Sequence, residues 1–266
     1  MTRPLRRLCL QAVLSYLLAA PLQASTPTAD LADSLARVAP GLDRQVLRHA
    51  VAAMQCAVNH GADQAQRLAV IDYSQPSTVR RLWIFDLQRK QLVLRDLVAH
   101  GRLSGENHAN RFSNVVGSFQ SSLGLFRAAE SYRGKHGYSL RLDGLEPGVN
   151  DRARERAIVI HGAEYVDPRL ADSQGRIGRS LGCPAVRPEV ARLVVDQLKE
   201  GQFVFAWYPD RRWLQNSAYL NCQPQQVAAV LGNLDNAPEH HTSVVGCIRP
   251  STSARTRRAP PAFNVA

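Results

Sequence analysis

Short apolar runs separated by polar turns fill the middle of this chain, and they constrain its fold more than any other feature. The runs at 68–73, 82–87 and 91–98 are rich in β-branched and aromatic residues, as buried strands are. Arg89 and Lys90 fit a tight hairpin turn between the second run and the third. Further strands are expected at 114–119, 124–128, 138–142, 157–161 and 203–208. Many strands and few helices predict a mainly β domain, mostly antiparallel, with helical additions.

Two other regions have helical spacing. Between 31 and 60 the apolar residues recur on one helical face with a break at Pro40-Gly41, so a short helix and a longer one are expected. Asp43 can cap the longer helix, and Gly61 can end it. Pro188 suits the first position of a later helix that ends before Gly201.

A histidine and a cysteine stand at the two ends of one loop. The β-branched run at 157–160 predicts a buried strand with His161 at its end. The polar loop 164–179 then returns the chain to Cys183, which is flanked by Gly182 and Pro184. A thiolate nucleophile needs a base within hydrogen-bond reach and small neighbours that leave the sulfur open. The spacing therefore predicts that His161 activates Cys183.

Composition divides the chain into four segments. Residues 1–24 carry three arginines and then an apolar stretch, which is the layout of a secretory signal peptide. The stretch is shorter than the ~20 residues of a spanning helix, so we expect cleavage, export and no stable membrane span afterwards. The other segments are an N-terminal helical segment at 25–65, a β domain at 66–208 and a C-terminal extension with a disordered tail at 209–266.

The chain is basic, with a formal net charge of +11 at pH 7. Loss of the three arginines of the signal peptide lowers this charge to +8. A basic exported protein suits an anionic partner such as a cell-wall polymer, a membrane surface or nucleic acid. Nucleic acid is disfavoured as a partner, because part of the charge lies in a proline-containing tail with Arg255, Arg257 and Arg258.

Four cysteines follow the signal peptide, and exported chains form disulfides. With Cys183 kept as a nucleophile, Cys222 and Cys247 are the expected bridge, because both lie in the C-terminal extension. Cys56 falls within a helical pattern and is expected to be a buried apolar side chain.

The segment 66–208 carries a series of motifs in a fixed order. They include Val98-Ala-His-Gly-Arg102, Gly134-Lys-His-Gly-Tyr-Ser-Leu140, Ile160-His-Gly-Ala163 and Gly178-Arg-Ser-Leu-Gly-Cys-Pro-Ala185. With these motifs the segment resembles the murein L,D-transpeptidase catalytic domain of the YkuD type. The resemblance implies a β-rich sandwich or barrel-like fold and a location in the periplasm or cell envelope of a bacterium.

The resemblance also implies a reaction on peptidoglycan. Cys183 would attack the diaminoacyl carbonyl of a tetrapeptide stem and expel the terminal D-alanine. An amine of a second stem would then take the acyl group, whereas water in its place would make the enzyme a carboxypeptidase. His161 can move the proton, and the N–H groups of Gly182 and Cys183 can hold the oxyanion. No metal ion or organic cofactor is called for.

Two positions depart from the broader family pattern. Leu181 stands where a second histidine is usual. Similar enzymes use the backbone carbonyl of that position to orient the base, so a leucine can serve there. Ala185 stands where an asparagine or arginine is common, so Arg179 or Arg187 is expected to contact the substrate carboxylate.

Other interpretations of the same residues are weaker. Gly178 to Gly182 also fits the G-x-S-x-G elbow of serine hydrolases, but that elbow follows a hydrophobic strand and precedes its histidine. Ser180 is expected instead to make a supporting hydrogen bond in the loop. In a papain-like peptidase the cysteine precedes the histidine. A non-catalytic module that binds wall peptides is the remaining alternative. The intact Cys183, His161 and Gly182 argue against it, whereas the missing polar residue at 185 keeps it open. His100 and His136 are expected to have structural or surface roles.

Overall fold

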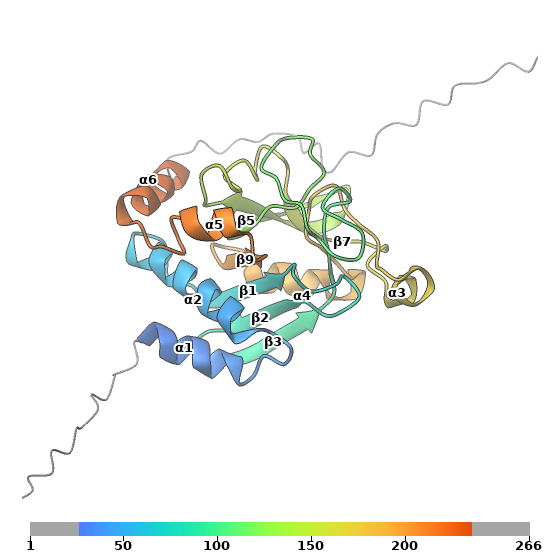
Figure 1. Cartoon of the computed structure of the whole chain (residues 1–266), viewed down its shortest axis with the longest axis horizontal. Coiled ribbons are helices and arrows are strands. Elements are labelled where there is room, and N and C mark those ends of the chain that lie inside the picture. The colour runs from blue at the N-terminus through green and yellow to red at the C-terminus, as the bar shows by residue number, and fades with distance from the viewer. Residues whose placement is uncertain (1–26, 236–266) are drawn as a thin grey trace, which may run out of the picture.

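The computed structural model describes residues 27–235 (Figure 1). The expected signal peptide at 1–24, Cys247 and the basic tail with Arg255, Arg257 and Arg258 lie outside these residues. None of the helices in the described range is long and apolar enough to cross a membrane.

One sheet of nine strands forms the body of the described structure, in the order β3-β2-β1-β9-β5-β6-β7-β8-β4. β3 (Gln91–Asp96) and β4 (Val98–Ala99) lie at the two ends of this order, yet only Leu97 separates them in the chain. The ends of the sheet are therefore close together, and the sheet curls into a nearly closed barrel. The other strands are β1 (Arg67–Asp72), β2 (Leu82–Asp86), β5 (Gly124–Gly134), β6 (Gly137–Gly144), β7 (Val159–Gly162), β8 (Ala185–Val186) and β9 (Phe203–Trp207).

This architecture confirms the predicted mainly β fold. Most neighbouring strands run antiparallel, whereas β1 pairs with β9 and β7 pairs with β8 in parallel. Every residue of β2 and of β9 is buried. Strands of this kind are covered on both faces, which explains their continuous apolar sequences.

The strand predicted at 114–119 is wrong, because this stretch is a loop. Asn114 donates to Asp151 at 2.7 Å and accepts from the Arg152 N–H at 3.1 Å. Val115 and Val116 are 60% and 46% exposed, so the apolar pattern that suggested a strand does not face the core. Side-chain hydrogen bonds hold this segment in place of a strand ladder.

Two helices precede the sheet, as predicted: α1 (Pro27–Ala36) and α2 (Arg44–Asn59). The Asp43 carboxylate caps α2 by accepting from the N–H groups of Gln45 and Val46 at 2.6 and 3.2 Å. The apolar face of α2 packs against β1, β5 and β9. Figure 1 shows α1 and α2 lying along the part of the sheet that β1, β2 and β3 form.

Four further helices complete the described chain. α4 (Pro188–Leu198) is the helix predicted after the cysteine, and it packs against β6 and β7. α5 (Arg211–Asn216) and α6 (Pro224–Asp235) follow β9 and bury Trp213, Val227 and Leu231 in the same core. α3 (Pro168–Gln174) lies inside the predicted polar loop, buries no residue and projects from the body of the molecule (Figure 1).

The predicted disulfide is wrong, because Cys222 is bonded to Cys56 and not to Cys247. Their Cα atoms lie 5.5 Å apart, although 166 residues separate them in sequence. Cys56 lies in the last turns of α2, and Cys222 lies between α5 and α6. The bridge therefore joins the N-terminal helical segment to the C-terminal extension, and only the docking of α2 near α6 brings the two sulfurs together.

Candidate active site

Cys183 lies in a tight loop that leads into β8. The residue is fully buried, is not in a disulfide, and points its thiol at the Ala157 carbonyl oxygen, 3.6 Å from Sγ. Gly182 has a φ of +129°, a conformation that favours glycine. The Ser180 hydroxyl donates to the Cys183 carbonyl at 2.6 Å and accepts from the Gly182 N–H at 3.0 Å. Ser180 thus makes the supporting hydrogen bonds that the sequence suggested.

Neighbouring segments hold this loop from both sides. The Ser180 N–H donates to the His100 carbonyl at 2.9 Å, and the Arg102 N–H donates to the Ser180 carbonyl at 2.7 Å. On the other side, the Ser121 hydroxyl donates to the Gly182 carbonyl at 3.1 Å. The backbone around Cys183 is therefore fixed before any substrate arrives.

His161 lies in β7 and is 1% exposed. Its Nδ1 is 2.9 Å from the Gly162 carbonyl oxygen. Because a carbonyl oxygen can only accept, Nδ1 carries the proton and Nε2 carries the lone pair. Within the described part of the chain, Nε2 has no hydrogen-bond partner. The carbonyl that orients the ring is therefore that of Gly162 and not, as the sequence suggested, that of Leu181.

The sheet brings His161 and the cysteine loop to one place. β7 runs parallel to β8, and His161 lies directly beside Ala185 in this register. Cys183 precedes Ala185 by two residues, so it lies in the loop that leads into the strand next to that of His161. The loop between them is anchored by Val166 and Ile177, which pack against Ala99 and Ala185 in a small apolar cluster.

The surroundings of His161 favour its neutral form. Burial lowers the pKa of His161 to about 4, and the nearby His136 acts in the same direction. At neutral pH the ring therefore carries no charge, and its Nε2 is free to accept a proton. A neutral imidazole of fixed tautomer can act as a general base for a thiol within its reach.

His136 contacts His161, which the sequence did not indicate. The two ring centroids are 4.5 Å apart, with 31° between the ring planes. His136 lies in the turn between β5 and β6, and β6 pairs with β7 so that Ser139 is opposite His161. Only this strand register brings the turn to the site, and no spacing along the chain reveals it.

A guanidinium next to the cysteine loop holds the segment 113–122. Arg156 donates to the carbonyl oxygens of Ser113 and Gln120 and to the hydroxyls of Ser118 and Ser122. The same segment lies against the loop, because a Cβ added to Gly182 would come within 3.0 Å of the Gln120 carbonyl oxygen. Residues 113–122 therefore form part of the cover over the site.

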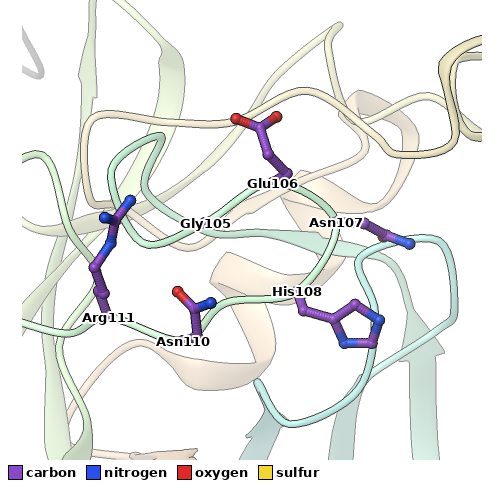
Figure 2. Close-up of a pocket in the computed structure, with 6 residues that line it drawn as sticks. All are labelled: Gly105, Glu106, Asn107, His108, Asn110 and Arg111. Carbon is purple, nitrogen blue, oxygen red and sulfur yellow. The ribbon is translucent and has the colours of Figure 1, made fainter.

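Two cavities lie near these segments. The larger, of about 730 Å³, is lined by Gly105, Glu106, Asn107, His108, Asn110 and Arg111. Figure 2 shows that these residues follow one another along a single loop and that Glu106 and His108 point in different directions. A smaller cavity is lined by Tyr73, Ser121, Gly182 and Pro184, among others, and so touches the cysteine loop directly.

The chain matches a family model described as an L,D-transpeptidase catalytic domain over residues 38–207, well over half its length. The chain belongs to the L,D-transpeptidase catalytic domain family. No curated protein matches it.

Several solved L,D-transpeptidase structures are similar to this domain at low identity. One from Mycobacterium smegmatis is 15% identical, with a TM-score of 0.34, over 54% of this chain and 59% of its own. One from Stackebrandtia nassauensis is 11% identical, with a TM-score of 0.34, over 69% of this chain and 92% of its own. A helical cell shape determining protein from Campylobacter jejuni is 11% identical, with a TM-score of 0.39, over 68% of this chain and 62% of its own. Similarity at this level adds nothing to the family assignment.

In this L,D-transpeptidase domain both candidate carboxylate-binding arginines contact protein oxygens. Arg187 makes two hydrogen bonds to the buried Asp96, at 2.8 and 2.6 Å. Arg179 donates to Glu106 at 2.7 Å and to the Gly105 carbonyl at 2.8 Å. Either guanidinium would have to exchange one of these oxygens for a substrate carboxylate.

A possible metal-ligand set is made by residues outside the cysteine loop. Cys56, His60 and Cys222 place one ligand atom each within 4.8 Å of one another. The two sulfurs are bonded to each other, so neither offers the thiolate that a metal ion requires. In this state the group is a disulfide with a neighbouring imidazole.

Proposed function

We propose that the chain is a peptidoglycan L,D-transpeptidase in which Cys183 is the nucleophile and His161 is the general base. The orientation of His161 carries this proposal, because the Gly162 carbonyl fixes the proton on Nδ1 and leaves Nε2 basic. Family membership supports the reaction type.

The proposed reaction has two steps. The Cys183 sulfur attacks the diaminoacyl carbonyl of a tetrapeptide stem while Nε2 of His161 takes the thiol proton. The amide bond then breaks, the proton passes to the leaving nitrogen, and D-alanine departs, leaving a thioester. An amine of a second stem attacks the thioester, His161 takes the amine proton, and the released sulfur regains a proton.

We assign the oxyanion of each tetrahedral intermediate to the backbone N–H groups of Gly182 and Cys183. In the resting structure the Gly182 N–H donates to the Ser180 hydroxyl, so the oxyanion would take over this donor from Ser180. Ser180 keeps its second bond, to the Cys183 carbonyl, throughout.

Access of the substrate requires a movement of the cover. Cys183 is fully buried, whereas a peptide stem must reach its sulfur. The segment 113–122 is held mainly by side-chain hydrogen bonds and carries two exposed valines at its tip. We propose that this segment shifts and that Arg179 or Arg187 then contacts the substrate carboxylate.

The substrate also sets the location that we propose. Peptidoglycan lies outside the bacterial cytoplasmic membrane, so the chain would be exported to the periplasm or cell envelope. The Cys56–Cys222 disulfide suits an oxidising compartment.

Mass spectrometry of purified peptidoglycan stems incubated with the mature protein tests the reaction. Tetrapeptide stems should lose D-alanine and form dimers with the parent protein, and Cys183→Ala should abolish both changes. Loss of D-alanine without dimers would identify a carboxypeptidase that uses water. Unchanged stems with retained binding would identify a non-catalytic wall-binding module.

Two further measurements decide between Cys183 and Ser180 as the nucleophile. Ser180→Ala should retain substantial activity, because its hydroxyl contacts backbone groups only. A carbapenem should add to the parent protein and not to Cys183→Ala in an intact mass spectrum. An inactive serine variant beside an active cysteine variant would replace the proposed nucleophile.

A further inference from the structure

The hairpin turn between β5 and β6 places the side chain of His136 against His161, the candidate base. Gly134 pairs with Gly137, so Lys135 and His136 form a two-residue turn. Gly137 has a φ of +74°, which a glycine in such a turn adopts easily. Lys135 is exposed, whereas His136 is half-buried and lies with its ring 4.5 Å from that of His161.

The other neighbours of His161 are small and carry no charge. In the sheet register Ser139 of β6 lies on one side of His161 and Ala185 of β8 on the other. The start of α4 covers the adjacent Gly162, where Ala191 lies 3.0 Å from the position of an added Cβ. Towards the other end of α4, Asp196 pairs with Lys199, the residue that follows the helix, at 3.3 Å.

The ring of His161 needs more than its one hydrogen bond to be held in place. The backbone carbonyl of Gly162 fixes the tautomer of His161, but one hydrogen bond does not stop the ring from tilting. A second ring packed on its face does, and tilted pairs with centroids 4.5 to 7 Å apart are a favoured arrangement.

We propose that His136 is a positioning residue for the general base, which it holds by ring packing and shields from water. The inference rests on the proposed role of His161 and adds a residue to it from outside the segment 156–187 that holds His161 and Cys183. His136 does not touch the reacting atoms in this account. Its effect on the reaction passes entirely through the orientation and hydration of His161.

Three variants of His136 in the full mature chain separate ring packing from polarity. His136→Phe keeps a ring without a titratable group, His136→Gln keeps polarity without a ring, and His136→Ala keeps neither. Lys135→Ala, in the same turn, is the matched control. Circular dichroism confirms that each variant is folded before it is compared.

The first readout is the titration of the His161 ring by NMR, assigned by its loss in His161→Gln. Burial is the main cause of the low pKa of His161, so the alanine and glutamine variants should move this pKa upward from about 4 toward 6.5. His136→Phe and Lys135→Ala should leave it near the parent value. This readout needs no substrate, so it remains decisive even if the protein does not process tetrapeptide stems.

The second readout is kcat on tetrapeptide stems. His136→Ala and His136→Gln should lower kcat about tenfold with little change in KM, because a mis-set base slows the chemical step. His136→Phe should restore kcat to within about twofold of the parent. A parent-like titration in His136→Ala would overturn the proposal. So would a phenylalanine variant as impaired as the alanine variant, which would mean that His136 acts through its own nitrogens.

Discussion

Two histidines with the same local sequence have opposite environments in this molecule. His100 and His161 each follow two apolar strand residues and precede a glycine, and their strands β4 and β7 flank β8 on either side. Both rings are buried, and burial lowers the pKa of both, to about 3 for His100 and about 4 for His161. They differ in what their nitrogens contact.

His100 has a partner on each nitrogen. Arg81 donates from Nη2 to Nδ1 at 2.7 Å, so Nδ1 is the acceptor, and Nε2 faces the Gly105 carbonyl oxygen at 3.4 Å. The buried cation also opposes any charge on the ring. In His161 the tautomer is reversed, and the basic Nε2 is left open. Burial alone therefore does not distinguish the two histidines, whereas the open lone pair on a ring of fixed tautomer makes His161 the one that could act as a base.

The largest expected difference between the two histidines is in catalysis. His161→Gln should lower kcat/KM on tetrapeptide stems by about 10² to 10⁴ fold, because general acid–base catalysis contributes on that order. His100→Gln should stay within about fivefold of the parent, because glutamine can accept from Arg81 and donate to Gly105. Rates for the two folded variants check this difference. Equal losses of kcat/KM in the two variants would contradict a catalytic role for His161 and a structural role for His100.

The second difference is in stability, and here the larger effect is expected at His100. His100→Ala removes the acceptor of a buried Arg81 Nη2, and leaving such a donor unsatisfied costs about 1–3 kcal/mol, or more for a charged group. His161→Gln removes no hydrogen bond at the Nε2 position, because Nε2 has no partner there, so it should lower the free energy of unfolding by less. Urea unfolding measures both free energies. A more stable His100→Ala protein would contradict the structural role of this pair.

Part of this contrast can be predicted from sequence, and part cannot. Most of the strands and the α2 cap at Asp43 are predicted correctly because each depends on local pattern, and the pairing of His161 with Cys183 stays a prediction. The Cys56–Cys222 bridge, the contact from His136 and the Gly162 carbonyl depend on strand register and helix docking. His100 and His161 look alike in sequence because their difference comes from Arg81, which directly precedes β2 and contacts His100 only in the folded chain.

The smallest expected effect is on the pH dependence of stability. Both histidines have a folded pKa below the ordinary 6.5, so the unfolded chain binds more protons between these values. Their contribution is therefore complete above about pH 6.5 and is lost as the pH falls toward 4 for His161 and 3 for His100. His161→Gln should flatten the decline above pH 4 by up to about 1.4 kcal/mol per pH unit. Urea unfolding at several pH values measures the slope, and an unchanged slope would mean that the ring titrates alike in both states.

The pH dependence of Cys183 alkylation tests most directly whether Nε2 of His161 takes the thiol proton. Iodoacetamide is small, Cys56 and Cys222 are bridged, and a Cys247→Ser background removes the other thiol that follows the signal peptide. Alkylation of the parent should stay fast near pH 7, well below the free thiol pKa of about 8.5. His161→Gln should move the midpoint upward toward about 8.5, and His100→Gln should leave it in place. An unchanged profile in folded His161→Gln would contradict the account and end the case for a catalytic pair.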